Sequence, residues 1–488
     1  MMEKCLKQCL VYSSVFIVSL FFTFVRPAYA DLFPLGETFG VSRFSDEHIQ
    51  LLEPSDTGNR PSLIYEGGDL FLGTGNLQEG FETHWGAVWQ PQLWVFGTLR
   101  TALHYFDNGV RPSSAEWATR LSLFANLQLT HTEKLIIGIR PLDRNAFNRF
   151  TRVQLNDDFG SSKFEANADI RTFFFEGDFG SLFPGLDKKG TGAIDYGFSV
   201  GRQAITFQNA IMINETVDSV GVVRNNIRFA GISGMRSTAL YGWGELNRAD
   251  ARLNRSADMF GWFNSIDTPK HTFNIDMIFI NDKQTTGDSV NFGVAAIQRL
   301  GHFNTAFRIN SSFEPGANSP KAGTGTIFSS EVSWTPYRSD DIAYVNAFIV
   351  DGNYTQAGRE PIVGGALGGF GVLFASPGVG NFLSELNNFT TDVAGLVVGY
   401  EAFWDNHRRS LTLEVASRKD ISDRGTGFDD VAFGFEFRQR LAHRVQFQLD
   451  ASYSVLEKRN DGSTIRTEIR YSFNFFNRPR LICKDIFL

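Results

Sequence analysis

Beyond position 30 the chain lacks long hydrophobic runs, and no stretch there approaches 18 consecutive apolar residues. This excludes a transmembrane helix in that part of the chain. Basic residues are fewer than acidic ones, 46 against 53, with a formal net charge of −7, which argues against nucleic acid as a partner. The eight histidines form neither an HExxH motif nor a spaced ligand cluster. We therefore predict no enzyme, no metal site and no cofactor.

The first thirty residues have the pattern of a secretory signal peptide. Lys4 and Lys7 form a short positive region, residues 10–25 are mostly apolar, and Ala28 and Ala30 supply the small side chains of a cleavage site. We expect export through the Sec pathway and cleavage after Ala30. The mature chain would then begin at Asp31.

Cysteine is scarce, with three residues in the chain, and Cys5 and Cys9 lie in the signal segment. Cleavage would leave Cys483 alone, so the exported protein would have no internal disulfide. Its stability must have another source. A closed β-barrel provides one, because all of its strands are paired and no edge is left open.

The strongest pattern present is alternation of apolar and polar residues with a period of two, which places the two kinds of side chain on opposite faces of a strand. One apolar set is Val445, Phe447, Leu449, Ala451, Tyr453 and Val455. The pattern recurs at 120–130, 411–416, 431–438 and 465–475. A soluble β-sandwich also alternates. Strands of about ten residues with a continuous apolar face are long for a soluble sheet and long enough to cross a bilayer, so we predict an all-β fold, a transmembrane antiparallel β-barrel.

The connections between the predicted strands support this architecture. Short and long links alternate along the second half of the chain, with the C-terminus on the short side, as in outer-membrane barrels, whose short turns are periplasmic. The count is about 18 strands (16–20) from Gln92 onward, or twenty if 63–89 adds a hairpin. Segment 177–193 is too long for a periplasmic turn, which indicates a miscount there. We divide the chain into a signal peptide (1–30), a periplasmic lead (31–62), the barrel (63–476) and a periplasmic tail (477–488).

Two connections are more apolar than external loops in water should be. Segment 351–389 contains Gly364, Gly365, Gly368, Gly369 and Phe370, followed by an apolar run. We predict that it folds into the barrel as a constriction or lid; the alternative is a loop packed on its neighbours without a gating role. The loop predicted at 204–218 is the second candidate for inward folding.

If the apolar faces contact lipid, the polar faces line a pore. The predicted pore-lining residues are Arg100, Arg120, Arg171, Arg308, Arg438, Arg466, Arg470, Glu414, Glu436 and Glu468. Such charges select permeants or pair with one another to hold the wall in shape. Their mixed signs do not decide between an anion and a cation preference.

Residues 196–203, which end in Gly201-Arg202-Gln203, together with the following Asn214-Glu215 and Asp218, resemble the alginate-export-type outer-membrane barrels. That resemblance implies an eighteen-stranded barrel that passes a polyuronate through an arginine-lined pore. The final predicted strand, which ends in aromatic residues near Phe475, resembles the assembly signal of outer-membrane barrels. It implies the barrel-assembly machinery as a partner.

Together these features predict an outer-membrane channel, a porin or exporter that passes small hydrophilic solutes or an anionic saccharide by diffusion. Its expected partners are outer-membrane lipid and lipopolysaccharide, the assembly machinery and the solute, with no nucleic acid. A structural or adhesive barrel with a blocked lumen is the alternative, and a barrel hydrolase is a third hypothesis. Conductance, partner binding and loss of hydrolysis on mutating a histidine would separate the three.

Overall fold

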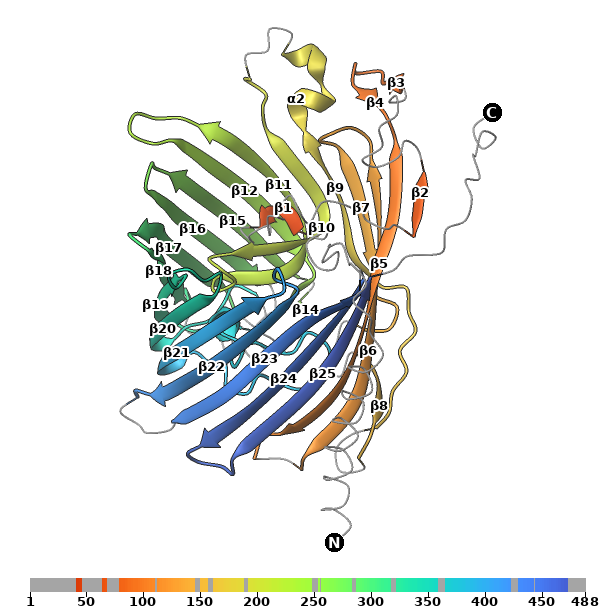
Figure 1. Cartoon of the computed structure of the whole chain (residues 1–488). Coiled ribbons are helices and arrows are strands. Elements are labelled where there is room, and N and C mark those ends of the chain that lie inside the picture. Colours follow the sequence, from red (N-terminus) through yellow and green to blue (C-terminus); the bar gives the residue numbers. More distant parts are fainter. Residues whose placement is uncertain are drawn as a thin grey trace.

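The computed structural model is an all-β antiparallel barrel (Figure 1). It describes residues 41–45, 64–67, 79–109, 112–144, 150–156, 161–187, 192–247, 253–254, 256–282, 287–316, 322–358, 365–422, 429–442 and 444–472. The wall strands are β5 (Gln92–Asp107), β6 (Ser114–Gln128), β7 (Lys134–Ile139), β8 (Thr151–Gln154), β9 (Ile170–Asp178), β10 (Gly197–Phe207), β11 (Ile213–Ile227), β12 (Gly234–Gly244), β15 (Ala257–Asp267), β16 (His271–Asp282), β17 (Ser289–Leu300), β18 (Phe303–Phe313), β19 (Gly325–Trp334), β20 (Ile342–Asn353), β21 (Thr391–Trp404), β22 (Arg409–Asp420), β23 (Asp430–Ala442), β24 (Val445–Leu456) and β25 (Gly462–Ser472).

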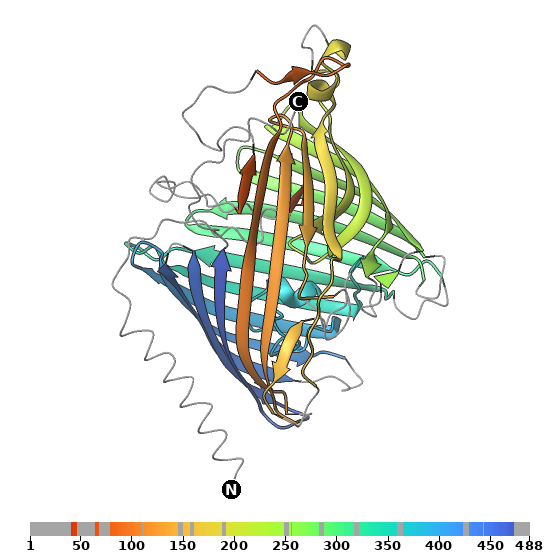
Figure 2. The same cartoon turned by 90° about the vertical axis from the view of Figure 1, so that its right-hand side faces the viewer.

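Apart from β8, which pairs with β6, and β7, which pairs with β6 and β9, each wall strand pairs antiparallel with the next in chain order, and β25 pairs with β5 to close the barrel. β7 and β8 share one position in the wall, because both pair with β6, at opposite ends of that strand. The predicted 18-strand barrel is therefore confirmed. Figure 2 shows the orange strands β5 and β6 running side by side, and β7 lies between β6 and the yellow β9.

Several shorter elements lie outside this series. β1 (Val41–Ser45) pairs with β10, and β2 (Tyr65–Gly67) pairs with β5. Two small hairpins are separate from the wall; they are formed by β3 (Phe81–Glu82) with β4 (Val88–Trp89) and by β13 (Leu246–Asn247) with β14 (Leu253–Asn254). The described part of segment 63–89, residues 64–67 and 79–89, therefore adds no wall hairpin.

Among the residues that the structure describes, helical structure is confined to short segments: α2 (Phe179–Leu182), η3 (Pro184–Leu186) and η5 (Ala366–Gly369). Within the described residues no helix is long and apolar enough to cross a membrane. α2 and η3 lie in the connection between β9 and β10. That connection is genuinely long, so the miscount inferred at 177–193 was wrong.

Some predicted segments lie outside the described residues. These are the signal peptide at 1–30, the tail at 477–488, Gly364 and Cys483. Of the predicted lead at 31–62, the structure describes only Val41–Ser45.

The outer face of the wall is apolar. On β6 and β23, Trp117 and Phe433 are each 49% exposed, whereas their neighbours Ala118 and Ala432 point inward and are fully buried. Most outward positions of these strands, such as Leu121 and Phe435, thus carry aromatic or aliphatic side chains. This is the surface that a hydrocarbon environment requires.

The two ends of the barrel differ. At one end, here called the short-turn end, β17 and β18 are joined by residues 301–302 and β23 and β24 by residues 443–444. At the opposite, long-loop end, β20 and β21 are joined by residues 354–390. This confirms the predicted alternation of short and long connections.

The orientation of β23 generates a prediction. Phe435 is an outward residue at the middle of this strand, and Gln439 is an outward residue near its short-turn end. Phe435→Arg should destabilise the folded barrel by roughly 2–4 kcal/mol, and Gln439→Arg by roughly 0–1 kcal/mol, because a lipid-facing charge costs most at the bilayer centre. Urea unfolding in lipid vesicles would measure both. Equal effects of the two substitutions would mean that this face does not contact hydrocarbon.

Candidate functional site

The described part of the β20–β21 connection, residues 354–358 and 365–390, is here called the inner loop. It packs against the inner face of the wall, and its short helix η5 lies within the outline of the barrel (Figure 2). On β22, the carboxylate of Glu414 accepts the backbone N–H groups of Val372 at 3.0 Å and Leu373 at 2.9 Å. It also accepts the Tyr344 hydroxyl of β20 at 2.6 Å. One wall carboxylate therefore fixes a turn of the inner loop through its backbone.

A second group of contacts holds the inner loop to β5 and β6. Glu116 accepts the backbone N–H of Asn381 at 2.8 Å and its side-chain amide at 3.2 Å. Arg120 Nη1 donates to the Gly378 carbonyl oxygen at 3.0 Å. A Cβ at Gly378 would lie 2.6 Å from Arg100 Nη2, so a side chain there would displace this guanidinium.

Further along the loop, Arg418 of β22 donates to the Phe389 carbonyl oxygen at 2.9 Å and also to that of Asn387. Asn346 of β20 donates to the Phe370 carbonyl oxygen at 2.7 Å. Wall carboxylates thus accept hydrogen bonds from loop N–H groups, and wall cations and amides donate hydrogen bonds to loop carbonyl oxygens. These bonds satisfy backbone groups that a buried loop would otherwise leave unpaired.

The turn between β10 and β11, residues 208–212, is the second segment inside the barrel and is here called the hairpin tip. Its predicted extent of 204–218 was wrong, because the strands continue to Phe207 and resume at Ile213. Pairing between β10 and β11 satisfies the backbone groups on both sides of the turn. The strands therefore continue through the apolar residues that were predicted to form a loop. The ring of Phe207 stacks on Phe263 of β15, with centroids 3.5 Å apart, and Gln208 Nε2 donates to Asp276 Oδ2 of β16 at 2.6 Å.

The hairpin tip and the inner loop contact each other. The Tyr354 hydroxyl donates to the Ile211 carbonyl oxygen at 2.9 Å, and the Ala357 N–H donates to that of Met212 at 3.0 Å. Ile211 belongs to the same buried cluster as Leu367 and Phe374, whose side chains are fully buried. Two segments far apart in sequence therefore share a hydrophobic core within the barrel, which removes their apolar side chains from water.

A cavity of about 830 Å³ lies between residues 368–372 and 375 of the inner loop and the inner wall from β17 to β23. Its charged lining is mixed: Arg308 pairs with Glu331, and Arg438 Nη2 lies 2.5 Å from Glu436 Oε1. Glu401 of β21 adds a further carboxylate. The cavity brings together the predicted residues Arg308, Arg438, Glu436, Gly368, Gly369 and Phe370.

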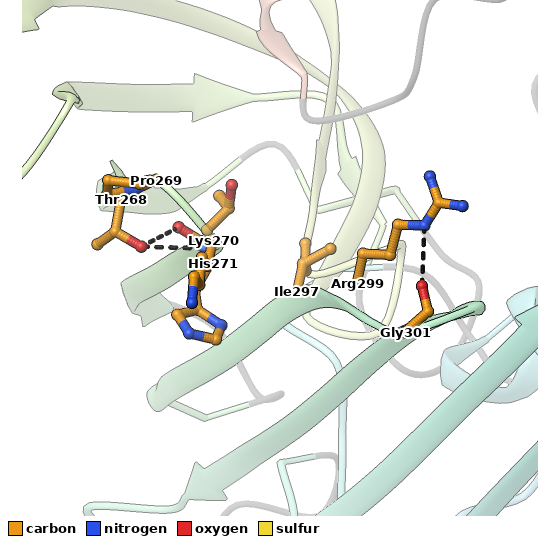
Figure 3. Close-up of a pocket in the computed structure, with 8 residues that line it drawn as sticks. Thr268, Pro269, Lys270, His271, Ile297, Arg299 and Gly301 are labelled. Atoms are coloured by element: carbon orange, nitrogen blue, oxygen red, sulfur yellow. Dashed lines mark hydrogen bonds between the residues drawn. The ribbon is translucent and has the colours of Figure 1, made fainter.

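A smaller pocket of about 380 Å³ adjoins it at the short-turn end, where the β15–β16 and β17–β18 turns face each other (Figure 3). Lys270, His271 and Arg299 supply its basic groups, and Arg299 Nε donates to the Gly301 carbonyl oxygen at 3.3 Å. Ile297 and Arg299 line both hollows. The rim of the larger cavity is therefore basic on this side.

The remaining predicted charges gather on the opposite part of the wall. Arg100 makes two hydrogen bonds to Glu468, at 2.6 and 3.0 Å, and Arg470 Nη2 lies 3.7 Å from the same carboxylate. Arg466 pairs with Asp450 at 2.7 Å and with Glu468 at 3.2 Å. The other ion pairs here join Asp143 to Arg120 and Arg171.

The predicted pore-lining residues therefore have three roles: some line the cavity, some form ion pairs on the opposite part of the wall, and some bind the inner loop. Arg120 and Glu414 bind the inner loop, and Gly365 belongs to that loop. Sequence reasoning missed Glu116, Asp143 and Asn381. Glu116 could have been found, because it is an inward position in the alternation of β6; Asp143 lies in an irregular segment with no such pattern.

His104 is an inward residue of β5 that is 4% exposed and meets the ring of Phe382 edge to face, with centroids 4.5 Å apart. Neither ring nitrogen has a hydrogen-bond partner among the described residues. No cluster of three metal-ligating side chains occurs in that part of the chain either. His104 thus packs as a contact surface for the inner loop.

The Gly-Arg-Gln segment lies on β10. Arg202 makes two hydrogen bonds to Asp218 of β11, Nε to Oδ1 at 2.8 Å and Nη2 to Oδ2 at 3.0 Å, and Nη2 lies 3.0 Å from Glu245 Oε1. The preceding Gly201 has a φ of +125°, and a Cβ there would lie 2.2 Å from the Phe173 carbonyl oxygen of β9, so this close approach of the two strands requires glycine. The arginine and acidic residue quoted from the sequence are thus paired.

The fold is that of known outer-membrane porins. The chain is similar to a BenF-like porin from Pseudomonas fluorescens Pf-5, with 11% identity, a TM-score of 0.53, and coverage of 78% of this chain and 99% of that one. It is also similar to Pseudomonas aeruginosa OccK2 (OpdF), with 10% identity, a TM-score of 0.53 and coverage of 79% and 98%. For P. aeruginosa OpdK, solved with vanillate, the values are 12%, 0.51, 78% and 98%.

The sequence matches no protein-family model and no curated protein. The likeness to the porins therefore concerns the fold, at identities too low to carry over their permeants.

The anchoring of the inner loop by Glu414 can be tested by substitution. In Glu414→Gln the charge-assisted bonds from Val372 and Leu373 are weakened, and such bonds are each worth about 1.5–3 kcal/mol. We expect hydrogen exchange at these two amides to accelerate by roughly tenfold to a hundredfold. Glu401→Gln, an inward carboxylate of the neighbouring β21, is the matched control. Unchanged protection in Glu414→Gln would show that the carboxylate does not hold the loop.

The inner loop should also respond to pH through Glu385. Burial raises the pKa of its carboxyl above the ordinary value of 4.5, and the nearby hydroxyls of Ser452, Ser454 and Thr464 offset part of this rise. The packed loop therefore binds the proton more tightly than a detached loop does, so its packing weakens as pH rises from 4.5 through the raised pKa.

Glu385→Gln should make the inner loop exchange more slowly than the unsubstituted chain at pH 7, and the difference should vanish below pH 4.5, where both side chains are uncharged. Comparing the two proteins at each pH cancels the pH dependence of the intrinsic rate of amide exchange. A constant ratio across this range would contradict the assignment.

Proposed function

We propose that the protein is a channel of the bacterial outer membrane that passes small hydrophilic solutes by diffusion. The observation that carries this proposal is the cavity of about 830 Å³ lined by Arg308, Glu331, Glu401, Glu436 and Arg438 inside a closed barrel with an apolar outer face. A charged cavity within such a wall offers a solute partners that replace part of its hydration. The porin fold of the similar structures agrees with it.

The inner loop and the hairpin tip set the width of the path. The inner loop is held by backbone hydrogen bonds to wall side chains, as at Glu414 and Glu116, and the hairpin tip by the side-chain hydrogen bond from Gln208 to Asp276. A solute that enters from the short-turn end meets the basic rim at Arg299, then the cavity, and then residues 368–372 of the inner loop.

An anion preference follows from the pairing register. Inward side chains at the same level of β23, β24, β25, β5 and β6 are, in order, Arg440, Gln446, Arg470, Arg100 and Arg120. Arg100, Arg120 and Arg470 of this row, with Arg171 and Arg466 beside it, form ion pairs to Asp143, Asp450 and Glu468. A row of four guanidinium groups at one level attracts anions.

The alginate-export-type resemblance at residues 196–203 agrees with an anionic saccharide as the permeant. The same row of guanidinium groups would also bind small organic or inorganic anions. The permeant class is therefore an anion with hydrogen-bonding groups, and no enzymatic step is part of the proposal.

A second candidate is a structural or adhesive barrel with a blocked lumen. Contact between the inner loop and the hairpin tip across the interior, at Tyr354 and Ile211, favours it. Conductance separates the two functions.

The location follows from the same proposal. The segment at 1–30 would direct Sec export and be removed after Ala30. The short-turn end would face the periplasm, as short turns do in outer-membrane barrels. Lipid and lipopolysaccharide would surround the apolar face, and the barrel-assembly machinery would insert it.

Single-channel recording in planar bilayers tests the proposal. The refolded protein should show stable conductance steps, with reversal potentials in a salt gradient that indicate anion selectivity. Arg470→Gln should lower the anion-to-cation permeability ratio by about twofold or more, because one charge of the row is lost. Arg409→Gln, on the outward side of β22, is the matched control and should leave the ratio unchanged.

Cation selectivity would overturn the anion preference while leaving the channel in place. A correctly folded barrel that gives no steps, but conducts after deletion of residues 364–375, would favour the blocked barrel. If that deletion is also silent, the channel function is wrong.

A further inference from the structure

The cavity between the inner loop and the wall has a balance of charge that the opposite part of the wall lacks. Its described lining contains equal numbers of arginine and glutamate residues: Arg299, Arg308, Arg438, Glu331, Glu401 and Glu436. The row on the opposite part of the wall carries arginines alone as its charged members: Arg440, Arg470, Arg100 and Arg120. A lining whose charges cancel does not favour a solute with a net charge of either sign.

Two ion pairs involve four of the six charged side chains of the cavity. Arg308 pairs with Glu331, and Arg438 pairs with Glu436. The side-chain amide of Asn209, in the hairpin tip, also donates to Glu331 at 3.2 Å. An ion pair already satisfies both of its members, so these four side chains offer a solute less than an unpaired charge does.

The remaining two charges, Glu401 and Arg299, are not paired. Among the residues that the structure describes, the Glu401 carboxylate has neither an ion pair nor a hydrogen bond, and its neighbours in register are Ile342 and Thr412. Within the same residues Arg299 makes one side-chain hydrogen bond, from Nε to the Gly301 carbonyl oxygen (Figure 3). A carboxylate and a guanidinium therefore line the cavity with the capacity to bind further partners.

These two charges are well separated, because Arg299 lies on β17 and Glu401 on β21. The strands between them place uncharged polar side chains at the level of Arg299, namely Asn304, Ser333 and Tyr344. Four strand spacings of about 4.8 Å amount to roughly 19 Å along the wall, which the two long side chains shorten by reaching inward. A solute that meets both charges must therefore carry its own charges at separate ends.

The surroundings of the two charges strengthen their difference in sign. The smaller pocket shares Arg299 with the cavity and adds Lys270 on the β16 side. On the other side, Glu436 lies at the level of Glu401, with Thr412 between them. The β17 side thus attracts an anionic group and the β21 side a cationic one.

We propose that the cavity binds a solute with an anionic group at one end and an ammonium group at the other. The anionic group lies at Arg299 and the ammonium group at Glu401. This assignment rests on the proposed channel function, and it narrows the permeant from any anion to one that also carries an ammonium group. Such a solute matches the balanced charge of the cavity and replaces water at both unpaired side chains.

Current block in single-channel recordings tests this assignment, with 6-aminohexanoate as the probe. Two solutes are matched controls: norleucine is an isomer that has both charged groups on one carbon atom, and hexanoate lacks the ammonium group. The probe should block the current with an apparent dissociation constant at least about fivefold below those of both controls, because it alone carries opposite charges at separate ends.

Substitutions connect this preference to the two residues. Glu401→Gln should raise the dissociation constant of 6-aminohexanoate to that of hexanoate and leave the hexanoate value unchanged. The charge swap Arg299→Glu with Glu401→Arg should restore the preference, because opposite charges again lie on β17 and β21. Arg409→Gln, on the outward side of β22, is the matched control and should change neither value.

The recordings separate this assignment from the channel function itself. Conductance without a preference for 6-aminohexanoate would overturn the assignment and leave the channel in place. A preference that persists in Glu401→Gln, or one that the charge swap does not restore, would likewise show that these residues do not form the site. If the unsubstituted protein does not conduct, the proposed function is wrong and the assignment with it.

Discussion

The closed pairing of the wall is the constraint on which the rest of this structure depends. A strand in hydrocarbon must pair all of its backbone groups, so the sheet has to return to its first strand, as β25 does with β5. Closure creates two faces with opposite requirements. Phe433 and Ala432 are adjacent in sequence, yet one faces the surroundings at 49% exposure and the other is fully buried inside. The period of two in the sequence arises because the two faces of the wall need different side chains.

Most of the charged side chains of the wall that point into the interior either bind the inner loop or form ion pairs with one another. Glu414, Glu116 and Arg120 bind the backbone of the inner loop, while Arg100, Arg470 and Glu468 bind one another. Backbone anchoring has a specific advantage, because it holds a glycine-rich segment that has few polar side chains to offer. Arg120 takes part in both roles, since it donates to the inner loop at Gly378 and lies opposite Arg100 in the arginine row.

Sequence alone predicts the wall well and its contents poorly, for a physical reason. Alternation is local, so the strands around Leu449 and Phe433 and the count of eighteen could be predicted, as could the apolar character of the β20–β21 connection. The partner of a charge is not local: Glu414 and Leu373, or Arg120 and Gly378, meet only after closure. The limits of the β10–β11 turn were missed for a related reason, since apolar residues such as Ile205 and Ile213 face a second layer inside the barrel rather than lipid.

That second layer has a consequence for the wall. Beyond Arg202 and Asp218, β10 and β11 pair with each other but no longer with β9 and β12. Turning the hairpin inward therefore narrows the lumen and at the same time removes two strand edges from the wall register. A parallel strand, β1, lies on one of these edges. The backbone groups on that edge of β10 need partners once β9 no longer pairs with them, and β1, which lies outside the strand series, supplies them.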